Sequence, residues 1–288
     1  PMTRVLWMSN APWAKTGYGD QTLSFCATMT ARGHELAVLA NFGLQATRMD
    51  IGINGRKVAV YPMGKEMYSN DVVQATADDF NADLVITLYD AWPLKFAALK
   101  GHHTPWVAWA PIDHETITPG VLESLKRADR AIAYSRHGQR AMLEGGLENA
   151  LYIPHGVNTD IFAPGDMAAA REKLGLPGLE TFLVGMVAAN NFYPSRKCIP
   201  QALCAFADFK KHSGAKTAIY LHMVDDESNG GIDIRRIAQA LGLKFGEDYF
   251  LPDPFELRMG IPTPAMVELY QAFDVLLNPS FGEGFGIP

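Results

Sequence analysis

Short apolar segments alternate with helix-length amphipathic segments along almost the whole chain, and this alternation constrains the fold more than any other feature. Such an order is typical of parallel α/β architecture, in which each helix connects two neighbouring strands. In the first half, strands are predicted near residues 4–8, 35–40, 57–61, 83–88, 105–110, 130–134 and 150–153. Helices are predicted near residues 20–32, 70–79, 92–99, 118–127 and 135–144.

A second series of the same kind follows a Pro/Gly-containing stretch at residues 162–166 and a short predicted helix at 167–174. Its strands are predicted near residues 181–188, 216–223, 248–251 and 274–278, and its helices near 198–212, 232–241 and 263–271. We therefore expect two doubly wound domains, residues 1–163 and 164–288. In such sheets ligands bind at the carboxyl ends of the strands.

Composition limits the classes of partner. The 288 residues carry a net charge of -6, which argues against nucleic acid as the main partner. The three cysteines, Cys26, Cys198 and Cys204, have no metal-ligand or redox spacing, which favours a reducing compartment. No apolar run is long enough to cross a bilayer, and no signal peptide is evident. We expect a cytoplasmic protein without a transmembrane segment, and leave open a peripheral association with a membrane.

The segment F-G-E-G-F-G-I-P at residues 281–288 follows the last predicted strand. Its glycines would let backbone amides approach a ligand closely, and the carboxylate of Glu283 can accept hydrogen bonds from hydroxyl groups. This combination suits a sugar better than a bare phosphate, which would favour lysine or arginine.

Arg196 and Lys197 stand where a helix is predicted to begin, after the first strand of the second series. Cations at a helix start oppose the helix dipole unless an anion binds there. A diphosphate held by both side chains and the helix amides satisfies this arrangement. A solvated basic pair is the alternative.

Two loops of the first half are further candidates. Gly17 and Gly19 lie between the first strand and the first helix, but the loop is neither a dinucleotide fingerprint nor a nucleoside-triphosphate loop. The alternative is that this loop is an ordinary strand–helix connection whose conformation requires glycine. Asp113 and His114 follow the strand at 105–110, where a polar loop capping the next helix is the alternative. Consecutive residues make a poor chelate and the sequence contains no Asp-x-Asp pair, so no metal site is predicted.

Together, residues 190–197 and 274–288 resemble family 4 retaining glycosyltransferases. Their signature is two glutamates separated by seven residues, with Gly-Phe-Gly-hydrophobic-Pro directly after the first. Glu283 matches the first glutamate, and the second would fall three positions beyond Pro288. The resemblance implies the GT-B fold: two Rossmann-like domains facing a cleft, the second incomplete here. We accordingly expect the natural protein to be about one-quarter to one-third longer, and these 288 residues to be inactive when expressed alone.

The resemblance also implies roles for individual residues. Lys197 would contact the donor diphosphate, Glu283 would hold the donor sugar, and His114 would orient the sugar near its reacting carbon. Asn191 stands where the family commonly has arginine, so Arg196 would supply the missing charge. The remaining predicted donor-binding residues are Gly17, Gly19, Asp113, Gly284, Phe285 and Gly286.

The predicted activity is retaining transfer of a sugar from a nucleotide diphosphate sugar to a hydroxyl acceptor, which could be a saccharide, a lipid or a small molecule. No cofactor and no metal are expected. A catalytically silent nucleotide-sugar binding protein of the same fold is the alternative, supported by Asn191 and the missing second glutamate. A nicotinamide-dependent oxidoreductase is disfavoured, because neither half carries the glycine fingerprint.

Overall fold

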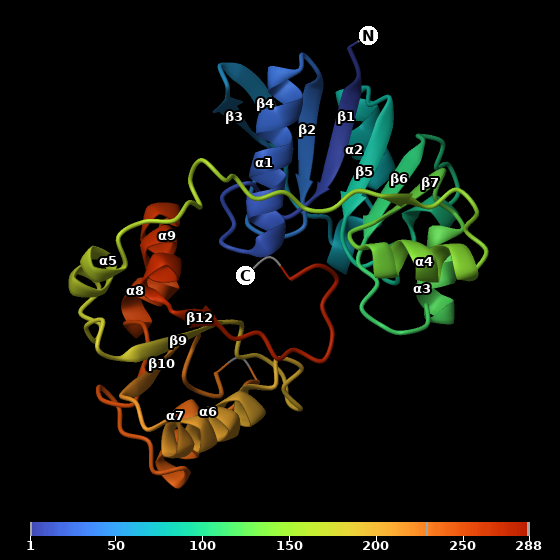
Figure 1. Cartoon of the computed structure of the whole chain (residues 1–288). Helices are drawn as coiled ribbons and strands as arrows, with labels where there is room; N and C mark the ends of the chain where they lie inside the picture. The colour runs from blue at the N-terminus through green and yellow to red at the C-terminus, as the bar shows by residue number, and fades with distance from the viewer. Residues whose placement is uncertain (1, 229, 287–288) are drawn as a thin grey trace. The chain divides into compact units, whose positions relative to one another are not determined.

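A computed structural model describes residues 2–228 and 230–286 of the chain (Figure 1). They form two compact units, which we call unit 1 (residues 2–156 with 283–286) and unit 2 (residues 157–228 and 230–282). Each unit has its own α/β sheet, as the alternation predicted. No helix in this described part of the chain is long and apolar enough to span a membrane.

The sheet of unit 1 has eight strands in the order β3-β4-β2-β1-β5-β6-β7-β8. All neighbours pair in parallel except β3, which is antiparallel to β4. The inner strands are buried on both faces, which explains their continuous apolar sequences. The strands are β1 (Arg4–Ser9), β2 (Glu35–Ala40), β3 (Met49–Ile53), β4 (Arg56–Tyr61), β5 (Leu84–Leu88), β6 (Trp106–Ala110), β7 (Arg130–Ala133) and β8 (Leu151–Tyr152).

Helices cover both faces of this sheet (Figure 1). The side chains of Leu6 and Met8 on β1 pack in one core with α2, α3 and α4, whereas Val5 and Trp7 pack in the other with α1. The helices are α1 (Gly17–Ala31), α2 (Val73–Phe80), α3 (Pro119–Leu125) and α4 (Arg136–Glu144), with 3-10 turns η1 (Met67–Ser69) and η2 (Phe96–Ala98).

In unit 1 one predicted helix was wrong and one strand was not predicted. The helix expected at 92–99 is only the 3-10 turn η2, because the amides of Lys95 and Phe96 donate to the Asn70 side chain and the chain extends at Leu99. The edge strand β3 was missed because its residues, apart from Ile53, are not fully buried and form no apolar run. The Asn-Gly turn after β3 was the available signal for this hairpin.

Unit 2 contains a four-stranded parallel sheet in the order β11-β10-β9-β12. Val184 of β9 packs with α6 and α7 on one face, and Leu183 packs with α5 and α9 on the other (Figure 1). The strands are β9 (Phe182–Val187), β10 (Thr217–His222), β11 (Tyr249–Phe250) and β12 (Val275–Leu276). The helices are α5 (Met167–Lys173), α6 (Ile199–Ser213), α7 (Ile234–Ala240), α8 (Pro254–Met259) and α9 (Thr263–Ala272).

A buried arginine joins separate elements of unit 2. The guanidinium of Arg171 on α5 donates to the carbonyls of Gly178, Thr181 and Ala272 and to the carboxylate of Asp274. The same carboxylate accepts the Leu183 amide at 2.6 Å. A single side chain therefore fixes the entrances of β9 and β12 and the end of α9.

Candidate functional site

The carboxyl edge of unit 2 brings the predicted cationic loop against the start of the glycine-rich segment. Strands β9 and β12 are neighbours in the sheet, so the loops that follow them emerge side by side. The Arg196 guanidinium donates to the Gly282 carbonyl, and the Phe281 amide donates to the Arg196 carbonyl at 3.0 Å. The loop after β9 and the start of the glycine-rich segment are distant in sequence, but they lie together at the carboxyl edge of this sheet.

Lys197 lies just ahead of helix α6. The cap residue Cys198 adopts a left-handed conformation, with φ 54°, and gives no side-chain acceptor to the amides of the first turn. Pro200 in that turn has no N–H. A fifteen-residue helix whose start has no side-chain cap and is preceded by two cations favours an anion at that end.

Asn191 is exposed, whereas its neighbour Asn190 is buried and structural. The Asn190 amide nitrogen donates to the carbonyls of Val224, Asp226 and Ile232, and its oxygen accepts the Ile232 amide. Asn190 therefore fixes the loop after β10 against the loop after β9. Sequence reasoning missed this role, because nothing in an Asn-Asn pair indicates which side chain is buried.

In unit 1, the loop after β1 leads directly into α1, and the residues at this junction are tightly packed. The Thr16 hydroxyl caps the helix by accepting the Gly19 amide at 3.0 Å and is itself held by the Asn10 side chain at 2.8 Å. A Cβ at Gly19 would lie 2.0 Å from the Ala14 carbonyl oxygen, so packing alone accounts for this glycine. Gly17 is the exposed first residue of α1.

Asp113 and His114 follow β6 at the same carboxyl edge of unit 1. The His114 Nδ1 lies 2.7 Å from the Asp113 carboxylate. The His137 Nε2 on α4 donates to the His114 carbonyl at 2.7 Å, which anchors the loop to the neighbouring helix. The imidazole of His114 is exposed, so this pair is available to a ligand.

Residues 283–286 of unit 1 pack beside that loop. A Cβ at Gly284 would lie 2.3 Å from the Pro111 Cβ, and the Phe285 ring is 5.3 Å from the His155 ring. Gly286 has φ 80°, a conformation suited to glycine. The structure thus brings the segment containing Glu283 together with the loop of Asp113 and His114; Ile287 and Pro288 of the predicted motif lie outside the described residues.

His155 lies at the centre of an aromatic cluster that the sequence did not indicate as functional. Its ring is buried 4.1 Å from the Tyr134 ring and 5.1 Å from the Trp109 ring. Its Nδ1 donates to the Gln21 side-chain oxygen at 3.1 Å. Burial lowers the pKa of His155 to about 4, so the imidazole is neutral near pH 7.

A second group of aromatic residues consists of Tyr18 on α1, Tyr89 directly after β5 and Tyr134 directly after β7. The Tyr89 hydroxyl donates to the Asn10 side chain, and the Tyr18 and Tyr89 rings meet edge to face at 5.2 Å. Burial raises the pKa of Tyr18, and the carboxylate of Asp90 raises it further. Tyrosines placed directly after apolar strands, such as Tyr89 and Tyr134, were the available sequence signal.

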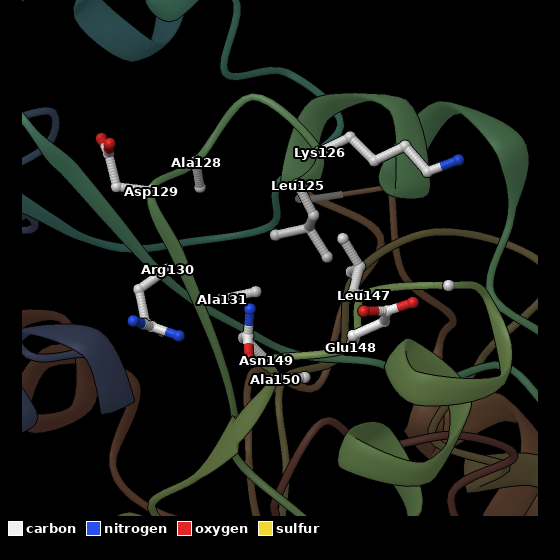
Figure 2. A pocket seen from close by; sticks show the side chains of 11 residues that line it. Leu125, Lys126, Ala128, Asp129, Arg130, Ala131, Leu147, Glu148, Asn149 and Ala150 are labelled. Carbon is white, nitrogen blue, oxygen red and sulfur yellow. The ribbon is translucent and has the colours of Figure 1, made fainter.

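A hollow of about 310 Å³ elsewhere on unit 1 is not part of this site (Figure 2). It lies at the amino ends of β7 and β8, near Leu125, Arg130 and Leu147, whereas parallel sheets bind ligands at the carboxyl ends. Asp129 at its rim is already engaged, because its carboxylate accepts the Trp106 amide at 2.8 Å. Among the described residues, no group of three or more His, Cys, Asp or Glu side chains forms a metal site.

Comparison with known proteins finds glycosyltransferases. The D-inositol 3-phosphate glycosyltransferase of Acidothermus cellulolyticus is 28% identical over 225 residues, which cover 76% of this chain and 46% of that protein. The enzyme of the same name from Nocardia farcinica is 26% identical over 226 residues, covering 76% and 46%. The chain therefore spans less than half the length of these curated relatives. No protein-family model matches the chain.

Solved structures extend the likeness to almost the whole chain. Sucrose-phosphate synthase from Thermosynechococcus elongatus matches with a TM-score of 0.73 and 18% identity, covering 99% of this chain and 77% of that one. E. coli trehalose-6-phosphate synthase bound to UDP-2-fluoro glucose matches with a TM-score of 0.68 and 13% identity, covering 99% and 80%. Anabaena HepE in complex with UDP and glucose matches with a TM-score of 0.64 and 16% identity, covering 96% and 74%. The chain has the GT-B fold, as the resemblance implied.

Proposed function

We propose that this chain transfers a sugar from a nucleotide diphosphate sugar to a hydroxyl group of an acceptor, with retention of anomeric configuration and without a metal ion. The names of the curated relatives and the UDP-containing structural neighbours support the transferase assignment. The observation that carries it is the pair Arg196–Lys197 ahead of the start of α6, which has no side-chain cap.

The diphosphate of the donor binds at the carboxyl edge of unit 2. Lys197 and the first-turn amides of α6 lie on consecutive stretches of chain, so a single anion can meet both. Arg196 also fixes the adjoining loop through the Gly282 carbonyl. Its guanidinium replaces the arginine that the resemblance would place at Asn191.

The sugar is held by the glycine-rich segment. Glu283 accepts hydrogen bonds from sugar hydroxyls, while the backbone of Gly284 to Gly286 approaches the ring. His114, fixed by Asp113 and by α4, orients the reacting carbon. No residue is assigned as a nucleophile, because the resemblance favours attack by the acceptor hydroxyl on the face from which the nucleoside diphosphate leaves.

Departure of the nucleoside diphosphate is the difficult step, because negative charge grows on the leaving phosphate oxygen. Arg196 and Lys197 stabilise that charge. Fixed donors in a site shielded from water typically contribute about 3–4 kcal/mol each. The protons of both side chains stay in place, so the cations act electrostatically rather than as acids.

Lys197→Ala tests the assignment by calorimetric titration with UDP, GDP and ADP and with the corresponding nucleosides. Loss of a charge-assisted hydrogen bond should weaken diphosphate binding by roughly ten- to a hundredfold. Nucleoside binding should stay unchanged, because no phosphate is present. Lys211→Ala is the matched control, since Lys211 lies in the last turn of the same helix. Equal diphosphate affinity in the Lys197 variant and the parent would remove the assignment.

A further inference from the structure

Strand β3 is the outermost strand of the unit 1 sheet, and only one of its sides is paired (Figure 1). Its five residues pair with β4 without interruption, from Met49 opposite Val60 to Ile53 opposite Arg56. The side of β3 that points away from β4 therefore carries backbone N–H and C=O groups with no strand beside them in the described part of the chain. We call this side the open edge of β3.

The open edge lacks the features by which the margin of a sheet commonly avoids pairing with another chain. Its sequence, M-D-I-G-I, contains no proline and no lysine, and its register with β4 contains no bulge. The terminal strands at the other margins of the two sheets, β8, β11 and β12, have only two residues each. A regular strand of five residues is long enough to accept a further strand.

The charged side chain on β3 already has partners within its own chain. The Asp50 carboxylate lies 2.7 Å from the Lys57 Nζ on β4 and 3.3 Å from the Arg48 guanidinium. Burying an unpaired charge would oppose docking. Because Asp50 is paired, a strand that docks on the open edge does not meet this cost.

Apolar side chains flank the open edge. Met49 on β3 is 42% exposed. The Asn54 side chain donates to the Ala27 carbonyl at 2.7 Å, which places the end of β3 against α1. Leu23 lies one turn before Ala27 on the same side of α1 and is 47% exposed. A strand paired with the open edge would remove part of this apolar surface from water.

From these observations we infer that the open edge pairs with β3 of a second copy of the chain, in antiparallel orientation about a two-fold axis. Residues that oppose each other in such a pair share a face of the sheet, so the axis passes through a residue. An axis at Asp50 would place two aspartates opposite each other. An axis at Ile51 pairs all five residues of both strands. Met49 then lies opposite the partner's Ile53. Asp50 lies opposite the partner's Gly52, so like charges do not face each other directly.

Position 52 tests this register. A Cβ at Gly52 would meet no atom within 4 Å, so a side chain fits there in the single chain. Gly52→Asp places an aspartate opposite the partner's Asp50 twice in each dimer, whereas Gly52→Lys places a cation there. Within one chain Gly52 lies opposite Lys57, so the two substitutions should affect the stability of the single chain in the opposite sense. Gly120→Asp is the matched control, because a Cβ at Gly120 on α3 also meets no atom within 4 Å.

Sedimentation velocity on the whole chain, at concentrations from about 1 to about 200 µM, measures the association. We expect a monomer–dimer equilibrium with a dissociation constant of roughly 10–100 µM, because the interface is small. Gly52→Asp should weaken the dimer by about tenfold, since two pairs of like charges are created. Gly52→Lys and Gly120→Asp should not weaken it.

Hydrogen exchange locates the interface. Raising the protein concentration from about 5 to about 200 µM should slow exchange in peptides that cover residues 49–54 and leave β8 unchanged, because pairing protects the outward N–H groups. A parent chain that stays monomeric at about 200 µM would overturn the inference and leave the open edge to a strand of a different protein. Equal dimerisation of Gly52→Asp and Gly52→Lys, or protection at a surface other than β3, would also overturn it.

Discussion

The carboxyl edges of the two units differ in chemistry although both terminate parallel strands. In unit 1 the edge is aromatic and acidic, with the rings of Tyr18, Tyr89 and Tyr134 packed under it. In unit 2 the edge carries Arg196 and Lys197 ahead of α6. In each unit the sheet therefore determines where a ligand can bind, and the loops that follow its strands determine the charge at that place.

The units also differ in the interactions that stabilise each of them internally. Unit 1 has an eight-stranded sheet with a large apolar core on each face. Unit 2 has four strands, two of which are only two residues long, and adds the buried guanidinium of Arg171. We expect unit 1 to depend on distributed packing and unit 2 to depend strongly on one polar network.

Arg171→Met should give the largest effect. The substitution leaves the Asp274 carboxylate and three carbonyls without their partner, and removing one member of a buried pair typically costs about 3–5 kcal/mol. Hydrogen exchange measured by mass spectrometry should show faster exchange throughout residues 166–276 and little change in unit 1.

Lys173→Met is the control for that experiment, because Lys173 lies on the same helix and forms an exposed ion pair with Glu268. Exposed pairs contribute about 0–1 kcal/mol. If both substitutions had equally small effects, the contrast between distributed packing and a polar network would be wrong.

Acid should destabilise unit 1 through His155. The folded pKa of about 4 lies below the usual value of 6.5, so the unfolded chain binds the proton more tightly. The stabilisation is present above pH 6.5 and is lost as the pH falls toward 4; the pKa difference corresponds to about 3 kcal/mol.

Urea unfolding followed by tryptophan fluorescence measures this effect in unit 1 alone, because all five tryptophans lie in residues 2–156. In His155→Gln the stability of unit 1 should depend less on pH over this range. An identical pH dependence in parent and variant would show that titratable groups other than His155 determine how the stability of unit 1 changes with pH.

The sequence predicted most of the fold for a physical reason. Strands buried on both faces, such as β1 and β2, are continuous apolar runs that local sequence reading can recognise. The exposed edge strand β3 carries no such signal. Short local sequence patterns were therefore sufficient to predict the strands that are buried on both faces of a sheet.

Prediction of the site was less complete. A basic pair at a helix start is a local pattern, so Arg196 and Lys197 could be proposed directly. The contacts of His155 with Gln21 join residues 134 positions apart, and Asn190 acts on a loop more than thirty residues away. Such contacts form only when the strands have taken their order in the sheet, and no local sequence pattern predicts them.

Chelation should have the smallest effect. If Arg196 and Lys197 neutralise the diphosphate, UDP affinity and sugar transfer in an active preparation should change by less than about twofold in EDTA, because fixed cations replace the charge that a metal ion would supply. Calorimetry with UDP and measurement of UDP release from nucleotide sugars check both. Full loss of turnover on chelation, restored by magnesium or manganese, would mean that the cationic edge of unit 2 does not neutralise the leaving group by itself. The contrast between the two edges would then have to include a metal ion.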